Sequence, residues 1–100
     1  MPADPTFRLT VQDVFSIKGR GTVVTGKIES GTLNVGDEIL ITRQGSSKKT
    51  VVTGIESFRK QLSRAQMGDN VGVLLRDIGK QDIQSGDVLT GSDSEFSWNP

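Results

Sequence analysis

The residues from Gly21 to Lys27 have the spacing G-x-x-x-x-G-K, which is most of the phosphate-binding loop of nucleotide hydrolases. In such a loop the backbone N–H groups surround phosphate, and a Ser or Thr after the lysine holds magnesium. Here the next residue is Ile28, which has no hydroxyl. The residues between the two glycines are all β-branched and favour a strand: Thr22, Val23, Val24 and Thr25. We therefore predict a β-hairpin strand at this position, with Lys27 as an ordinary strand residue.

Two further partial matches to enzyme motifs are also incomplete. Gly79-Lys80-Gln81-Asp82 resembles the guanine-reading motif Asn-Lys-x-Asp but lacks the asparagine. Ser57-Phe58-Arg59-Lys60 has the S-x-x-K spacing of penicillin-binding enzymes, without the Ser-Asp-Asn or Lys-Thr-Gly motif that accompanies it. Neither segment predicts an activity.

A Gly-Asp pair recurs three times just before a β-prone run, at Gly36-Asp37, Gly68-Asp69 and Gly86-Asp87. Glycine tolerates a positive φ, and an aspartate side chain can accept hydrogen bonds from nearby backbone N–H groups. We predict three turns of one kind. The alternative is that the aspartates gather around a metal ion. This alternative is not needed, because a role in the turn is sufficient to explain each aspartate.

The composition narrows the chemistry further. The chain has 100 residues, 33% of them hydrophobic, with 12 glycines and neither cysteine nor histidine. Disulfides, thiol nucleophiles and imidazole acid-base or metal chemistry are therefore excluded. Twelve basic residues balance twelve acidic ones. The N-terminus has no signal-peptide pattern and no apolar run is long enough to span a membrane, so we expect a soluble, cytoplasmic protein without membrane contact.

Charge is uneven along the chain. Between positions 41 and 64 the six basic residues outnumber the single acid, Glu56, whereas acids dominate from Asp77 onward. The basic residues are Arg43, Lys48, Lys49, Arg59, Lys60 and Arg64. Two interpretations of this distribution remain: a local basic face, and an ordinary solvated surface with scattered charge.

Short strands separated by turns organise the chain. We expect strands over residues 7–16, with a bend at Gln12-Asp13, over 22–29 and over 49–57, and a short helical turn within 58–66. In the strand over 49–57, Val51, Thr53 and Ile55 should share one face. This pattern predicts an all-β fold, a small closed antiparallel Greek-key β-barrel of roughly six strands. The expected domain organisation is an N-terminal extension (1–6), the barrel (7–90) and a loose C-terminal tail (91–100), from which Trp98 could dock on the barrel.

Most of the chain resembles one family. The stretches that carry the resemblance are Asp13 to Ile17, Gly19 to Gly26, Val35 to Glu38, Thr53 to Glu56, Phe58 to Lys60 and Gly68 to Arg76. Together and in this order they are similar to the second, β-barrel domain of translational GTPases, closest to elongation factor Tu.

The resemblance implies site residues. Glu56 would pack against the terminal adenine of tRNA, Phe15 and Thr25 would shape the adenosine pocket, and Asp13 and Asn70 would line the site for the aminoacyl group. For Phe15 and Thr25 an ordinary core or ladder role is equally open. Arg20, at the tip of a hairpin, is a possible rRNA contact.

The resemblance also implies partners. The chain would be a non-catalytic module and a monomer that helps to bind the aminoacylated 3′ end of tRNA and contacts the small ribosomal subunit during translation elongation. GTP and magnesium would bind only through a GTPase domain of the same or a partner chain, so the module itself would hold no cofactor. Residues 91–100 match nothing in the family, which leaves open an excised domain or a free-standing protein.

Three alternatives remain. The first is a protein-interaction barrel that docks on a GTPase domain or ribosomal partner without binding tRNA. The second is a nucleotide hydrolase, which would require Lys27 to contact a nucleotide. The third is a related initiation or selenocysteine-specific factor, because these share the barrel signature.

Overall fold

A computed structural model describes residues 4–58 and 60–91, in which ten β-strands and one short 3-10 helix form and no α-helix occurs. The strands are β1 (Arg8–Thr10), β2 (Asp13–Ile17), β3 (Gly21–Ser30), β4 (Thr32–Asn34), β5 (Glu38–Arg43), β6 (Ser46–Ser57), β7 (Lys60–Leu62), β8 (Arg64–Gln66), β9 (Asn70–Leu75) and β10 (Val88–Gly91); the 3-10 helix η1 covers Lys80–Asp82. No described residues form a helix long and apolar enough to cross a membrane.

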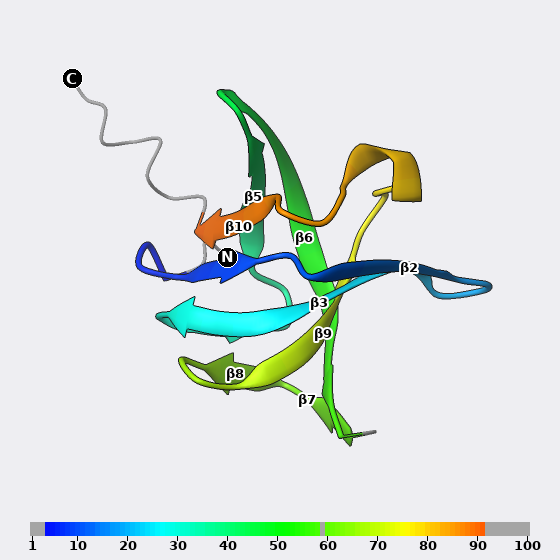
Figure 1. The fold of residues 1–100 in the computed structure, drawn as a ribbon. Helices are drawn as coiled ribbons and strands as arrows, with labels where there is room; N and C mark the ends of the chain where they lie inside the picture. The colour runs from blue at the N-terminus through cyan, green and yellow to red at the C-terminus, as the bar shows by residue number, and fades with distance from the viewer. Residues whose placement is uncertain (1–3, 59, 92–100) are drawn as a thin grey trace.

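Six strands close into a barrel in the order β1-β10-β5-β6-β9-β3, with β3 pairing back to β1 (Figure 1). Every pairing is antiparallel. Strands β5, β6 and β9 are neighbours in the wall, and β10 returns to lie beside β5. This is the Greek-key order. The predicted closed Greek-key barrel of about six strands is confirmed.

Strand β3, ten residues long, is shared between three partners. Its N-terminal half pairs with β2 and its C-terminal half with β1, while β9 lies along its other edge. The break between β1 and β2 falls at Val11 and Gln12, where the sequence predicts a bend. The whole segment from Gly21 to Lys27 lies in β3. The prediction of a strand at this position, in preference to a phosphate-binding loop, is confirmed.

Two local predictions are wrong. Residues 58–66 were expected to include a helical turn, but β7 and β8 occupy this segment because they find partners in β6 and β4. The alternation predicted for β6 also fails, since Val52 and Ile55 are both buried in the core. The register between β6 and β9 shifts between Val52 and Gly54, and such a bulge moves one residue out of phase.

The core is aliphatic, apart from Phe7. Its fully buried large side chains come from all parts of the wall: Phe7, Leu9, Ile28, Leu33, Ile39, Ile55 and Leu89, with Val11, Val24, Val52 and Val73 between them. No single segment contributes enough apolar surface to be stable alone, so burial of these side chains depends on closure of the barrel.

Closure brings β1 very close to β3 at Gly26. A Cβ atom at this position would lie 2.6 Å from the Thr10 carbonyl oxygen and 2.8 Å from a Leu9 methyl carbon. Both distances are shorter than van der Waals contact, so only glycine fits here. The second glycine of the G-x-x-x-x-G-K spacing is therefore explained by packing.

The three Gly-Asp pairs form the same turn, as predicted. Gly36, Gly68 and Gly86 have φ of 97°, 95° and 98°. In each turn the aspartate carboxylate accepts the backbone N–H of the residue three positions earlier, with distances of 2.8 to 2.9 Å. The donors are Asn34, Gln66 and Gln84. Glycine supplies the conformation and aspartate closes the turn.

The basic and acidic segments neutralise one another in part. Arg43 donates two hydrogen bonds of 2.8 Å to the carboxylate of Asp87, which is buried, and Lys48 lies 3.4 Å from Asp82. Hydrogen bonds from Arg43 lower the pKa of the Asp87 carboxyl, and they outweigh burial, which would raise it. These two contacts join the β5–β6 hairpin to η1 and to the turn before β10.

The structure describes part of the expected N-terminal extension and one residue of the expected C-terminal tail. Asp4, within the expected N-terminal extension, accepts a hydrogen bond from the Phe7 backbone at 2.9 Å, and its carboxylate accepts one from Thr32 at 3.2 Å. Gly91 belongs to β10. The rest of the expected tail, with Trp98, lies outside the described residues.

Substitution Gly26→Ala should lower the free energy of unfolding by about 1–3 kcal/mol, because the new methyl group meets backbone oxygen that cannot move without opening the β1–β3 contact. Gly54→Ala is the matched control, since its Cβ would lie 3.4 Å or more from the Leu74 side chain. Urea unfolding of both variants measures the difference. Equal stabilities would contradict the packing explanation for Gly26.

The Arg43–Asp87 pair should make stability depend on acid pH. Asp87 has a lowered pKa in the folded chain, so its contribution is complete above the unfolded value of about 3.9 and is lost as pH falls through the lower folded value. We expect Asp87→Asn to cost about 1–3 kcal/mol at pH 7. The gap between wild type and variant should stay constant to about pH 5 and close below about pH 4. A gap independent of pH in urea titrations would contradict the assignment.

Candidate functional site

A row of directly facing residues crosses the outer surface of the barrel. Asp13 faces Thr25, Thr25 faces Gly72, and Gly72 faces Glu56. The row ends at Gln61, opposite Glu56. Facing residues of antiparallel strands have their side chains on the same side of the sheet. Segments far apart in the sequence are therefore brought to one surface across β2, β3, β9, β6 and β7.

A hollow of about 230 Å³ lies over the middle of this row. Thr25, Glu56 and Asn70, three of the predicted tRNA-binding residues, line it. Gly72 lies in the row between Thr25 and Glu56, and because it has no side chain the hollow stays open. Asn70 is exposed at the start of β9. The arrangement offers a hydroxyl, a carboxylate and an amide to one ligand.

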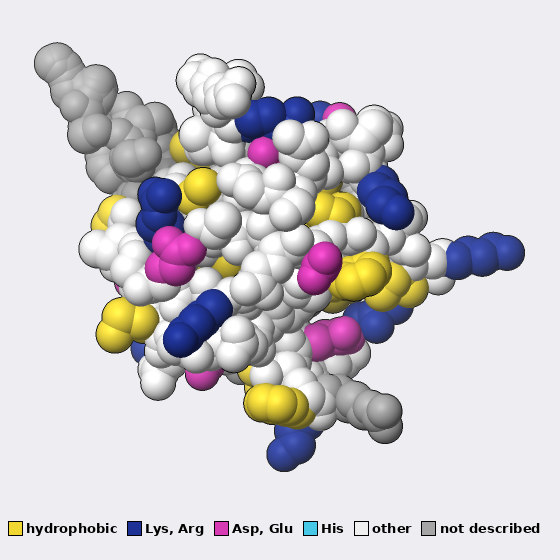
Figure 2. All heavy atoms as spheres, viewed as in Figure 1, with side chains coloured by type: hydrophobic (Ala, Val, Ile, Leu, Met, Phe, Trp, Pro, Cys, Tyr) yellow, Lys and Arg dark blue, Asp and Glu magenta, His cyan; other side chains and the backbone are white. Residues whose placement is uncertain are grey.

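The other two predicted tRNA-binding residues lie on β2, outside the lining of this hollow. Asp13 is exposed at the end of the row, beside Thr25. Phe15 faces Val23 in the next row and is 50% exposed, so its ring is no core residue. Thr25, in contrast, is partly buried and pairs in the ladder on both sides. Figure 2 shows apolar side chains gathered over β2, with charged side chains beside them.

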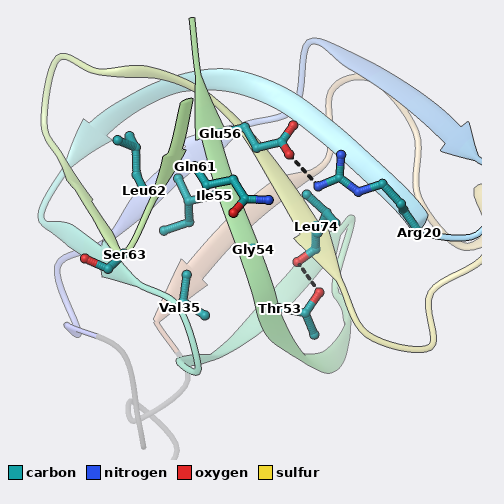
Figure 3. A pocket seen from close by; sticks show the side chains of 10 residues that line it. All are labelled: Arg20, Val35, Thr53, Gly54, Ile55, Glu56, Gln61, Leu62, Ser63 and Leu74. Atoms are coloured by element: carbon teal, nitrogen blue, oxygen red, sulfur yellow. Dashed lines mark hydrogen bonds and ion pairs between the residues drawn. The ribbon is translucent and has the colours of Figure 1, made fainter. Parts of the chain in front are cut away.

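A second hollow of about 380 Å³ adjoins the first and shares Glu56 with it (Figure 3). Its walls are largely apolar and include Leu74, Leu62 and Val35. Leu74 and Val23 are buried although they lie outside the core cluster, because they face one another on the outer surface. This hollow has the character of a site for a flat apolar group with a polar edge.

Arg20 reaches Glu56 from the turn between β2 and β3. Its guanidinium donates a hydrogen bond through Nη2 to Oε2 of Glu56, and the two form an ion pair. The side chains are 40% and 29% exposed. The sequence predicts Arg20 as a possible rRNA contact at a hairpin tip, which stays a prediction. The structure places its side chain against Glu56, one of the predicted tRNA-binding residues.

Phe58 is a site residue without a predicted role. It lines the hollow that holds Thr25 and Asn70, is 91% exposed and has a φ of 51°. A bulky residue rarely adopts a positive φ, and such strain is concentrated at functional sites. Its signal in the sequence is an isolated aromatic residue in a polar, basic stretch. An exposed ring can stack on an unpaired base.

Carboxylates are dispersed over the part of the chain that the structure describes. Across residues 4–58 and 60–91, no three Asp, Glu, His or Cys side chains lie together closely enough to hold one. The carboxylates of the Gly-Asp turns are instead engaged with backbone N–H groups. What the outer face offers is hydrogen-bond acceptors, an exposed aromatic ring and apolar hollows.

Comparison with known families gives one assignment. The family model described as elongation factor Tu domain 2 matches residues 21–90. This range contains Thr25, Glu56, Phe58 and Asn70 and most of the barrel, whereas Asp13, Phe15 and Arg20 precede it.

The strain at Phe58 can be measured without any ligand. We expect Phe58→Gly to unfold with a free energy about 1 kcal/mol higher than Phe58→Ala, because glycine adopts a positive φ without steric cost. Neither variant has the ring, so the comparison isolates the backbone. The opposite order, as usual for an exposed strand position, would show that the backbone is unstrained.

Proposed function

Because the chain belongs to the elongation factor Tu domain 2 family, we propose that it is a non-catalytic module of a translation factor that binds the aminoacylated 3′ end of tRNA on its outer face. The subfamily proposed is that of elongation factor Tu. In this proposal the module works in translation elongation in the cytoplasm, beside a GTPase domain of the same or a partner chain that supplies GTP and magnesium binding.

One observation carries the proposal: strands β3, β6 and β9 lie side by side, so that Thr25, Glu56 and Asn70 line one open hollow. Asp13 stands beside Thr25 at the end of the same row. A 3′ terminal adenosine presents an unstacked base, ribose hydroxyls and an ester-linked aminoacyl group with an ammonium. Carboxylate and amide oxygens accept hydrogen bonds from hydroxyl and ammonium groups. Apolar surface and aromatic rings accept the base by stacking.

The two hollows suggest which part of this ligand would lie in each. We place the adenine in the larger hollow, between Leu74 and the side chain of Glu56, with Phe15 on the neighbouring row. The ribose then lies near Thr25. The aminoacyl group extends over the smaller hollow toward Asn70 and Asp13, where Phe58 is exposed.

The geometry also supports a second wall from another domain. Both hollows are open on the outer surface, and Phe15 and Phe58 remain half to almost fully exposed beside them. A ligand held from one side only loses fewer water contacts and binds weakly. We therefore propose that a GTPase domain closes the site, and that the chain alone binds aminoacyl-tRNA with reduced affinity.

Titration of the isotope-labelled chain with aminoacyl-tRNA tests the site. Backbone amide shifts should concentrate at Asp13, Phe15, Thr25, Glu56 and Asn70, and they should be smaller with the same tRNA after deacylation. Glu56→Ala should weaken binding by about tenfold, as for a central contact of an interface, without lowering the free energy of unfolding by more than about 1 kcal/mol.

Glu38→Ala is the matched control, because Glu38 lies on β5 and lines neither hollow. Shifts that avoid the five residues would overturn the site assignment. Absence of tRNA binding together with tight, RNA-independent binding to a purified GTPase domain would instead favour the protein-interaction barrel.

A further inference from the structure

Two of the positions next to Glu56 on the outer face are glycines: Gly72 faces it from β9, and Gly54 lies two residues before it on β6. The third, Gln61, faces it from β7. Side chains two residues apart on a strand point to the same side, so neither glycine places a side chain against Glu56. The carboxylate therefore lacks steric support on these two sides, and a polar contact can set its direction.

Arg20 makes that contact from a well-defined turn. Its backbone N–H donates to the Ile17 carbonyl at 2.9 Å, and the flanking Gly19 and Gly21 have φ of 83° and 105°. Figure 3 shows the Arg20 and Glu56 side chains pointing toward one another and meeting among the residues that line the larger hollow. The turn holds the Arg20 guanidinium at a position from which its hydrogen bond can orient the Glu56 carboxylate parallel to the surface.

The pair also changes the charge of the hollow. A free carboxylate repels the phosphates of a nucleic acid, whereas a guanidinium in contact with it offsets that repulsion. A guanidinium has five N–H donors, so Arg20 can keep Glu56 in place while other donors remain available. Arg20 also lines a third hollow, together with Arg76.

We infer that Arg20 is a positioning residue: it orients the Glu56 carboxylate so that the Glu56 side chain forms a wall for the terminal base of the bound tRNA. This inference rests on the proposed function for the identity of the ligand. It assigns Arg20 to the tRNA site through Glu56, in addition to any contact with RNA phosphate at the hairpin tip.

A probe without phosphate separates this role from simple charge attraction. The probe is 3′-deoxy-3′-(phenylalanylamino)adenosine, an amide analogue of the aminoacylated terminal nucleoside that does not hydrolyse. We expect Arg20→Gln to weaken its binding by roughly threefold to tenfold, and Arg20→Lys to recover part of the loss, since lysine keeps the charge without the planar fork.

The double variant decides whether Arg20 acts through Glu56. If it does, Arg20→Gln changes affinity in wild type but not in the Glu56→Gln background. Equal losses in both backgrounds would show that Arg20 contacts the ligand itself, and would overturn the positioning role. Lys18→Gln, in the same turn, is the control and should bind as wild type does.

A measurement on the free chain keeps the inference testable if the nucleoside does not bind. The Glu56 side-chain carboxyl carbon should change its NMR chemical shift in Arg20→Gln and not in Lys18→Gln. A missing change would overturn the inference. A clear change without any binding of nucleoside or aminoacyl-tRNA would leave the ion pair established and show that the proposed function is wrong.

Discussion

Closure of the barrel through the β1–β3 contact is the constraint on which the rest of the structure depends. Strand β3 serves β1, β2 and β9 at once, and the change of partner along one edge takes place where Gly26 lets Leu9 and Thr10 approach. Without this contact the aliphatic core would open at one seam. The N-terminal half of β3 pairs with β2 instead of β1. The point at which β3 changes partner therefore also determines that Asp13 stands beside Thr25 on the outer surface.

The outer face of a packed wall is a suitable place for a binding site. The residues that alternate with Thr25 and Glu56 are core residues, so each site residue is held by a buried neighbour such as Val24 or Ile55. The backbone positions are thereby rigid, and rigid positions lower the entropy cost of binding. Phe58 is the exception, since it stands in an exposed turn at a positive φ that bulky residues rarely adopt.

Several residues that suggest chemistry in the sequence have structural roles instead. The three aspartates of the Gly-Asp turns satisfy backbone N–H groups, and Asp87 also fixes the β5–β6 hairpin through Arg43. Lys27 stands on a strand opposite Asn70. Arg20 shows the reverse, because a residue expected at a free hairpin tip meets Glu56, 36 positions away. The role of a charged residue in this barrel thus depends on the residue that it contacts, and spacing in the sequence does not show that contact.

Interactions within a few residues explain what could be predicted from the sequence. β-Branched runs favour strands, Gly-Asp pairs favour turns, and the number of short strands indicates a small barrel. The bulge that places both Val52 and Ile55 inside, the pairing of β7 and β8, and the row from Asp13 to Glu56 are seen only in the folded chain. These depend on register between strands distant in sequence, where a shift of one residue moves every side chain to the opposite face.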